Sequence, residues 1–307
     1  MTPNKRDLKA YSRFDGTGRI VPGSTVLRRN KPKVGTWIET QAYECCVPPT
    51  CPEPLIMEIL PSEGFFEFGM RSSSTNTVRG TIDWGDGTTE SFNFTGVSST
   101  SYISHNYSSP DYIPQTVRVT FTSVSGFRRL EIGDGNIVGT LLSVTNLPTV
   151  FAGSSIEQVD ADGTNIQSLD VSNLPIIELY ALECSNLTYL NVQGCTSLDN
   201  TELYSDNFTA LDFSGCASLV TATVYENYNL STLIIDDCDS LNYLEATDCD
   251  LNASAVNYIL VTLDNLGNLN GDVFLNNNLS GTNAAPTGAG ITAKNNLIAK
   301  GWQVITE

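Results

Sequence analysis

The sequence lacks the apolar segments that a membrane or an export pathway requires. No run of 18 apolar residues occurs in the 307-residue chain, so a spanning helix is excluded and we expect no membrane partner. The first seven residues lead into polar sequence rather than an apolar core, and we therefore expect no secretory signal peptide. Because 40% of the residues are hydrophobic, the chain is nevertheless expected to be globular rather than disordered.

Groups that carry out catalysis are equally scarce. His105 is the only histidine, and it belongs to a structural motif described below. It is therefore not available for a catalytic Ser-His-Asp or Cys-His arrangement. There is no phosphate-binding loop and no histidine-rich metal site. Carboxylates are abundant, but no pair is singled out for glycoside hydrolysis. We predict a protein without enzymatic activity, catalytic residues, cofactor or metal.

Positive charge is absent from a long part of the chain. Residues 1–46 carry nine Lys or Arg against four acids, a balance of +5, and the rest carries seven against thirty, a balance of −23. Between Leu130 and Ala293 there are 21 Asp or Glu and no Lys or Arg. An acidic body repels nucleic acid and anionic lipid. The basic segment suits either nucleic-acid phosphates or an acidic protein, of which we favour the protein.

The eight cysteines do not follow the logic of disulfide pairing. Cys195, Cys216 and Cys238 recur at spacings of 21 and 22 residues, which marks one position of a repeat. Cysteine at such a position behaves as a small buried apolar side chain. Cys45, Cys46 and Cys51 are not accompanied by the histidines of a zinc site. We predict free thiols.

The chain divides first at a proline-rich hinge. Residues 1–46 are too few to bury a core alone, so we expect a basic, extended anchoring arm, with a short strand at 36–40. Residues 47–54 form a stiff linker, because four prolines between residues 46 and 54 cannot continue a helix or a central strand.

Residues 55–128 show short alternating strands with turn-rich gaps, as in a β-sandwich. The predicted strands are Ile56–Ile59, Phe65–Phe68, Thr81–Trp84 and Thr116–Thr122. The run Asp83-Trp84-Gly85-Asp86-Gly87, followed by His105-Asn106-Tyr107 and a closing strand, resembles the PKD-like immunoglobulin sandwich. This resemblance implies a fold, not an activity. Gly85 and Gly87 favour a tight turn whose backbone amides Asp86 can cap, which is the role we favour; calcium binding by Asp83 and Asp86 is the alternative.

Residues 129–250 contain the strongest pattern, a repeat of 21–22 residues on the template L-x2-L-x-V-x2-C/N. A first series of strand centres lies at 169–171, 190–192, 211–213 and 233–235. A second, interleaved series lies at 159–161, 179–181, 201–203, 222–224 and 244–246. This predicts a leucine-rich-repeat solenoid with two strands in each coil, in which residues 130–158 form irregular first coils.

Residues 251–307 are predicted to form a small α/β cap on the open end of the solenoid. A helix is expected from Asn252 or Ser254 to Gly267, with Val256, Ile259, Leu260 and Leu263 on one face. A strand at 272–275, a helix near 293–299 and a strand at 302–305 follow. The predicted fold is therefore mostly β: a PKD-like sandwich, a solenoid and an α/β cap.

The two series of strands expose different side chains. The first exposes small polar residues, whereas the second exposes tyrosines and acids, and its candidate ligand-binding residues are Tyr180, Glu202, Tyr204, Tyr225, Tyr243 and Glu245. Tyrosines offer flat area suited to sugar rings or protein contacts, although strand surfaces favour tyrosine in any case. The acidic residues between Asp236 and Asp250 are predicted to be solvated carboxylates, and a cation site is the alternative.

Three regions resemble proteins of one biological setting. The repeats, such as Leu190-Asn191-Val192-Gln193-Gly194-Cys195, resemble surface leucine-rich repeats of gut Bacteroidota. The ending from Asn295 to Val304 resembles the termini of tail- or fibre-type proteins of phages that infect those bacteria. The opening, from Lys5-Arg6-Asp7-Leu8-Lys9 to Trp37, is similar to N-terminal arms of crAss-like phage virion proteins.

These resemblances imply a virion surface protein of the head- or tail-fibre type, assembled in the host cytoplasm and present as a homo-oligomer on the particle. The arm would bind other virion proteins, capsid or tail, through the anchoring residues Arg13, Phe14, Arg19, Arg28, Arg29 and Trp37. The solenoid would bind host surface glycan or protein. A bacterial surface adhesin and an intracellular interaction scaffold are the alternatives.

Overall fold

The computed structural model describes part of the chain in detail. The described residues are 9–13, 26–28, 37–40, 52–61, 64–73, 77–95, 100–108, 113–124, 126–133, 140–204 and 206–307. The chain forms two compact units, residues 1–51 and residues 52–307. As predicted, it is mostly β, with 39% strand and 12% helix.

The described residues of the first unit form the strands β1 (Lys9–Arg13), β2 (Val26–Arg28) and β3 (Trp37–Thr40). Strand β1 pairs with both others in antiparallel fashion, so the sheet order is β2-β1-β3. The predicted strand at 36–40 coincides with β3. The other two strands were not predicted, because single apolar residues between turn signals gave no period.

The second unit begins with eight strands in two sheets. They are β4 (Leu55–Leu60), β5 (Phe65–Ser72), β6 (Thr77–Asp83), β7 (Thr89–Thr95), β8 (Ser101–Asn106), β9 (Gln115–Ser123), β10 (Phe127–Gly133) and β11 (Thr140–Thr145). Five of them form a sheet of order β11-β4-β9-β6-β7. Strands β10, β5 and β8 form the end of a second sheet, and a short helix α1 (Leu147–Val150) follows β11. Inward-facing Phe66, Phe68 and Trp84 are fully buried between the sheets.

The turn after β6 follows the predicted chemistry. Gly85 and Gly87 have φ of 86° and 93°, a region that side chains disfavour. The Oδ1 atom of Asp86 accepts a 2.9 Å hydrogen bond from the Thr88 amide, and the His105 ring stacks on Trp84 at 4.8 Å. The Tyr107 hydroxyl donates to the Trp84 carbonyl. The capping role predicted for Asp86 is therefore confirmed.

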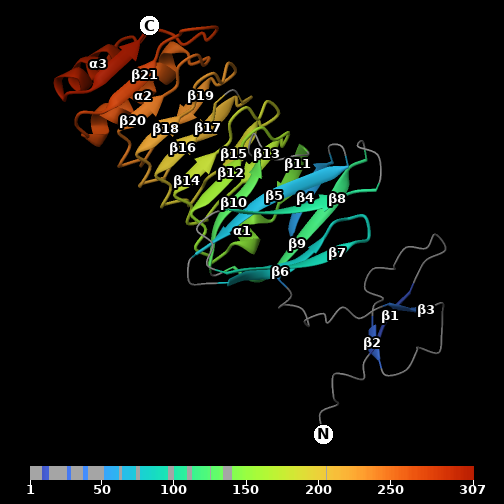
Figure 1. Cartoon of the computed structure of the whole chain (residues 1–307). Coiled ribbons are helices and arrows are strands. Elements are labelled where there is room, and N and C mark those ends of the chain that lie inside the picture. The colour runs from blue at the N-terminus through green and yellow to red at the C-terminus, as the bar shows by residue number, and fades with distance from the viewer. Residues whose placement is uncertain are drawn as a thin grey trace. The chain divides into compact units, whose positions relative to one another are not determined.

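From residue 158 onward the chain forms short strands, two for every 20 to 22 residues (Figure 1). The second series consists of β12 (Gln158–Ala161), β14 (Glu178–Tyr180), β16 (Asn200–Glu202), β18 (Thr221–Thr223) and β20 (Tyr243–Glu245). The first series consists of β13 (Ser168–Asp170), β15 (Tyr189–Asn191), β17 (Ala210–Asp212) and β19 (Thr232–Ile234). The strands of the second series all pair in parallel and in register, whereas those of the first series form two separate parallel pairs, β13 with β15 and β17 with β19. Each strand lies within one residue of its predicted position.

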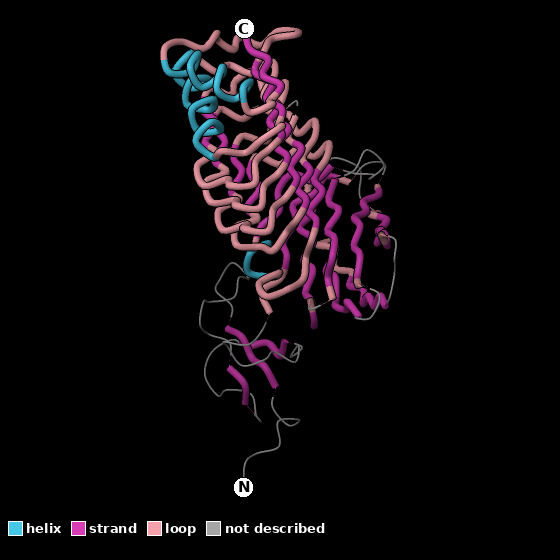
Figure 2. Tube along the Cα trace, turned by 90° about the vertical axis from the view of Figure 1, so that its left-hand side faces the viewer, coloured by secondary structure: helices cyan, strands magenta, loops and turns pink. Residues whose placement is uncertain are grey.

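Two further helices and two further strands complete the chain: α2 (Ala253–Leu266), β21 (Asp272–Leu275), α3 (Ala289–Ala299) and β22 (Gln303–Thr306). The Asn252 side chain caps α2, and Gly267 ends it at φ 78°, as the sequence predicted. Strand β21 pairs in parallel with β20, and β22 pairs in parallel with β21. Figure 2 shows both helices at the end of the stack that lies near the C-terminus.

One sheet runs through the whole second unit. Its order is β22-β21-β20-β18-β16-β14-β12-β10-β5-β8, so it joins the C-terminal strands to those of the first eight (Figure 1). Strand β10 makes the connection, because it pairs with β5 on one side and with β12 on the other. The boundary predicted at 128/129 falls inside this strand. Residues 130–158 were expected to form irregular first coils. They instead contain most of β10 and all of β11, which belong to the two preceding sheets, together with helix α1.

The core of the repeats is a continuous apolar column. Leucines and other apolar residues at the strand centres, such as Leu169, Leu190, Leu211 and Leu233, point inward together with the hinge residues Leu187, Leu198 and Leu219. Five cysteines, Cys184, Cys195, Cys216, Cys238 and Cys249, are buried and free. The predictions for Cys195, Cys216 and Cys238 are thus confirmed. Cys45, Cys46 and Cys51 lie outside the described residues.

Candidate ligand-binding face

The candidate residues lie on the outer face of the ten-stranded sheet, but in three different rows. The strand register places Tyr180, Glu202 and Glu245 in one row across β14, β16 and β20. Tyr243 lies in the neighbouring row, in register with Thr221 of β18. Tyr204 and Tyr225 come directly beyond the strands, each two residues after the position of Glu202 and Thr223. All six side chains are half-buried.

Two of the tyrosines form a stacked pair. The ring centroids of Tyr204 and Tyr225 are 4.6 Å apart, and the ring planes differ by only 12°. Partial burial, together with Tyr204 and the nearby Glu226 and Glu245, raises the pKa of Tyr225 to about 12. The phenol is therefore uncharged at neutral pH and offers a flat ring with a hydroxyl at its edge. The stacking predicted from the sequence is present.

The other two tyrosines are not part of this stack. The Tyr243 ring lies 5.8 Å from Phe274 at a 53° angle, and its hydroxyl donates to Glu245 Oε2 at 2.9 Å. Burial and this carboxylate raise the pKa of Tyr243 to about 12. The Tyr180 hydroxyl accepts a hydrogen bond from Asn200 Nδ2 at 3.3 Å. Tyr180 and Tyr243 thus lie in other rows of the sheet than the stacked pair.

The polar residues exposed by the first series have a structural use. Asp170, Asn191 and Asp212 each accept, through Oδ1, the main-chain amide two residues later, at 2.9 to 3.1 Å. They cap the turn that follows each strand, which explains why Asp or Asn recurs there. The second series carries the stacked pair Tyr204 and Tyr225, whereas the first series exposes Tyr189 of β15. The second series is therefore the better candidate for binding.

The row that holds Tyr180 continues into the first eight strands. Glu131 on β10 is in register with Asp160 on β12, and Asp160 with Tyr180. Arg129 lies 2.9 Å from both Glu131 and Asp160, and the Tyr102 hydroxyl donates to Glu131. Burial raises the pKa of Asp160 to about 6, although Arg129 opposes this shift. The candidate face thus ends at a buried ionic cluster that the repeat pattern alone did not reveal.

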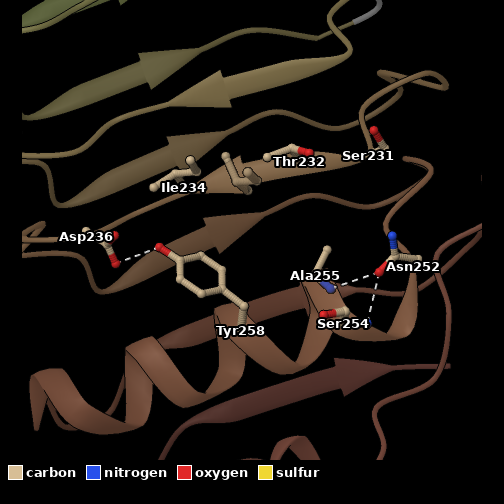
Figure 3. A pocket seen from close by; sticks show the side chains of 9 residues that line it. Ser231, Thr232, Ile234, Asp236, Asn252, Ser254, Ala255 and Tyr258 are labelled. Atoms are coloured by element: carbon tan, nitrogen blue, oxygen red, sulfur yellow. Dashed lines mark hydrogen bonds between the residues drawn. The ribbon is translucent and has the colours of Figure 1, made fainter.

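A groove of about 350 Å³ lies between β19 and the start of α2 (Figure 3). The Tyr258 hydroxyl donates to Asp236 Oδ1 at 2.7 Å and accepts from the Ile235 amide at 3.2 Å. Asn252 faces the same groove while its Oδ1 caps α2 through the amides of Ser254 and Ala255. The groove arises because α2 takes the place of the next strand of the first series. Sequence reasoning predicted the helix but not the space beside it.

The acidic residues near Asp236 have protein partners. The Oδ1 atom of Asp248 accepts three amides, those of Asn278, Leu279 and Gly281, at 2.7 to 3.1 Å. Asp250 accepts the Thr282 hydroxyl, and Asp236 accepts Tyr258 as above. Across the described ranges, no group of three or more His, Cys, Asp or Glu side chains is arranged to hold a metal ion. Asp248 and Asp250 therefore tie residues 278–282 to the loop that follows β20, and Asp236 is tied to α2.

The candidate anchoring residues belong to the first unit. Arg13, Arg28 and Trp37 lie in β1, β2 and β3, respectively. Phe14, Arg19 and Arg29 lie outside the described residues. Among the helices that the structure describes, none has the length and apolar character needed to cross a membrane.

Comparisons with protein families, with curated proteins and with solved structures find no match for this chain.

Proposed function

We propose that this protein is a phage virion surface protein, of the head- or tail-fibre type, whose repeats attach to the surface of a host cell. In this proposal residues 55–128 are a PKD-like sandwich and residues 129–250 a leucine-rich-repeat solenoid, closed by the cap at 251–307. Residues 1–46 anchor the protein to other virion proteins, and the protein has no enzymatic activity. The virion setting rests on the resemblance of the repeats and of both chain ends described above.

The observation that carries the attachment function is the stacked pair Tyr204 and Tyr225. The two half-buried rings stack on each other at 4.6 Å, so each has one face occupied by its neighbour and can meet a ligand only through its outer face or its hydroxyl edge. Such rings bind the apolar face of a sugar or a partner side chain at low entropic cost. Carboxylates at Glu202 and Glu226 border the platform and accept hydrogen bonds, as sugar hydroxyls or peptide amides require. We therefore expect a host glycan or a host protein as the ligand.

The anchoring role has its own support. The first unit concentrates nine of the sixteen Lys and Arg residues, whereas residues 52–307 form a separate compact unit. Opposite charge favours association of the first unit with an acidic surface. A virion protein that presents such a surface is the proposed partner.

The test is the protein composition of purified phage particles. We expect mass spectrometry to detect this chain in the particles, and a variant without residues 1–46 to fold but to be missing from them. A host-encoded chain found in the bacterial outer-membrane fraction would instead favour an adhesin. Normal incorporation of the shortened chain into particles would show that the anchor lies elsewhere.

A further inference from the structure

The ten-stranded sheet ends at β22 in an uncovered strand edge. The Gln303 amide donates to the Gly271 carbonyl at 2.9 Å, and β22 pairs with β21 in register along its whole length. In a parallel ladder alternate residues bond to the same neighbour. The amides of Val304 and Thr306 therefore point away from β21, and β22 is the last strand in the order. A strand edge of this kind is ready to pair with another strand.

Helix α3, which precedes β22, carries apolar side chains on two sides. Gly290, Ala293 and Leu297 are buried against the rest of the unit. Ile291 and Ile298 lie seven residues apart on another side, and 49% and 50% of their surfaces are exposed. The Lys294 ammonium on this side donates to the Thr306 hydroxyl of β22 at 2.8 Å. The exposed isoleucines and the free strand edge thus belong to one end surface, formed by Ile291, Lys294, Ile298 and β22.

The preceding helix shows what this surface is built to do. Helices α2 and α3 correspond at an offset of 34 residues, since Gly267 and Gly301 both follow their helices with positive φ. On α2, Asn257 donates to Thr287 at 2.8 Å and Asp264 accepts Lys300 at 2.7 Å, so α3 and its flanks cover that stripe. The residues 34 positions later are Ile291 and Ile298. The stripe of α2 that contacts α3 and its flanks therefore corresponds to the exposed stripe of α3.

Charge distinguishes this end from the rest of the repeats. Residues 130–293 hold 21 acids and no Lys or Arg, so lateral approach of two such bodies is repulsive. Residues 289–307 hold Lys294, Lys300 and Glu307, a balance of +1. The end surface is thus an apolar part of the second unit that lies outside the stretch without Lys or Arg, so two copies approach there with less repulsion than along that stretch.

We propose that the end surface binds the same surface of a second copy of this chain, related by a two-fold axis along the sheet normal. Such an axis places β22 antiparallel beside its counterpart and α3 antiparallel beside its counterpart. Because Ile291 and Ile298 lie on either side of Asn295, each isoleucine of one copy meets the other isoleucine of the second copy. The contact is self-complementary, as a two-fold interface requires, and it does not depend on the proposed attachment function.

The test compares two double variants of the full chain by sedimentation equilibrium. Wild-type protein is expected to dimerise at twice 33.2 kDa. Ile291→Glu with Ile298→Glu would replace the apolar contact by four carboxylates, which outnumber the two Lys294 ammonium groups of the dimer, and should raise the dimer dissociation constant by about 100-fold or more. The matched control, Ile177→Glu with Val220→Glu, adds the same charge at isoleucine and valine side chains that are 39% and 40% exposed on the repeats. It should dimerise like the wild type.

Amide hydrogen exchange provides a second readout that folding defects cannot imitate. We expect the Val304 amide to become protected as the protein concentration rises, while the Gln303 amide is protected at all concentrations. A wild type that stays monomeric, a double glutamate variant that dimerises normally, or Val304 exchange that is independent of concentration would each overturn the proposal. The last result, with dimers present, would place the contact on another surface.

Discussion

The Cys184 main-chain amide donates a 2.8 Å hydrogen bond to Oδ1 of Asp206, while the other carboxyl oxygen, Oδ2, is buried without a partner. The two residues occupy the same position in successive repeats, five residues after the middle residue of β14 and of β16, respectively. At this position Cys184, Asn227 and Cys249 each donate to a carbonyl of the preceding coil, those of Ala161, Leu203 and Val224. An ionised carboxylate cannot donate. A neutral Asp206 can, toward the corresponding Ala181 carbonyl.

Replacing Asp206 by Asn should therefore stabilise the protein at neutral and alkaline pH. Burial raises the pKa of Asp206 to about 8 from an ordinary value of 3.8, with Asp162 adding to the shift. Since the folded-state pKa is the higher one, the stabilising proton is fully bound below pH 4, and stability falls as the pH rises toward 8. The slope approaches roughly 1.4 kcal/mol for each pH unit in this range.

Urea unfolding between pH 5 and 9 measures this effect. The Asp206→Asn variant should show a flatter profile than the wild type and a higher midpoint at pH 8. Asn227 is the natural precedent for the amide at this position. A variant profile with the wild-type slope would mean that Asp206 is ionised in the folded protein.

Arg129 is predicted to be essential to the junction between β10 and β12. It lies 2.9 Å from Glu131 and from Asp160, whose side chains are only 1% and 9% exposed. Arg129→Met would leave two buried carboxylates without a cation and should cost about 3–5 kcal/mol in unfolding free energy. Arg128→Met is the matched control, because Arg128 pairs with Glu157 near the surface and such pairs contribute about 0–1 kcal/mol. Equal losses in the two variants would refute the role of the cluster.

Much of the fold follows from short-range signals in the sequence. The repeat spacing located every strand from β12 to β20 to within one residue, because the inward leucines recur with the coil itself. Asn252 and Gly267 marked the ends of α2 through their capping chemistry. These short-range signals do not predict that the ten-stranded sheet is continuous. This continuity depends on β10 pairing with both β5 and β12, and pairing partners far apart in sequence leave no local pattern.

The candidate site was predictable in part. Outward positions on the second series identified Tyr204 and Tyr225, since alternate residues of a strand share a face. Tyr180 and Tyr243 lie within strands, whereas Tyr204 and Tyr225 follow the strand ends. The repeat template does not fix the position of residues beyond the strand ends, so it did not predict that these tyrosines occupy different rows. The groove beside Tyr258 depends on a helix replacing a strand, and its depth follows from tertiary packing alone.

The repeat cysteines should be unreactive in the folded protein. The Sγ atoms of Cys195 and Cys238 contact the carbonyls of Val171 and Phe213 at 3.1 and 3.2 Å, inside the column. Burial raises the pKa of both thiols to about 12 and that of Cys216 to about 11, so the reactive thiolate is rare at neutral pH. Mass spectrometry after brief alkylation at pH 8 should find these three unlabelled until denaturant is added. Rapid labelling of all three in native protein would contradict their placement.

Replacing Cys216 by Asp should destabilise the repeats by several kcal/mol. The side chain is fully buried, and a carboxylate there would have no cation within a region that lacks Lys and Arg. Cys216→Ala is the matched control, which removes the sulfur without adding charge and should cost less. Thermal unfolding of both variants at pH 7 gives the comparison. A Cys216→Asp variant as stable as the alanine variant would show that the column tolerates charge.

If the repeats bind a host surface, the second series should carry the contact. Only this series presents a stacked aromatic pair, whereas Asn191 on the first series is occupied in capping the Gln193 amide. Each ring that stacks on a sugar or side chain contributes about 0.5–1.5 kcal/mol beyond burial. Tyr204→Ala with Tyr225→Ala should therefore weaken adsorption to host cells by about tenfold or more. Asn191→Ala with Gln193→Ala serves as the control, since it alters the same number of side chains on the first series and should leave adsorption within about twofold of the wild type. Circular dichroism of both variants separates lost binding from lost folding. Equal loss of adsorption in the two variants, or loss only in the control, would assign binding to the first series instead.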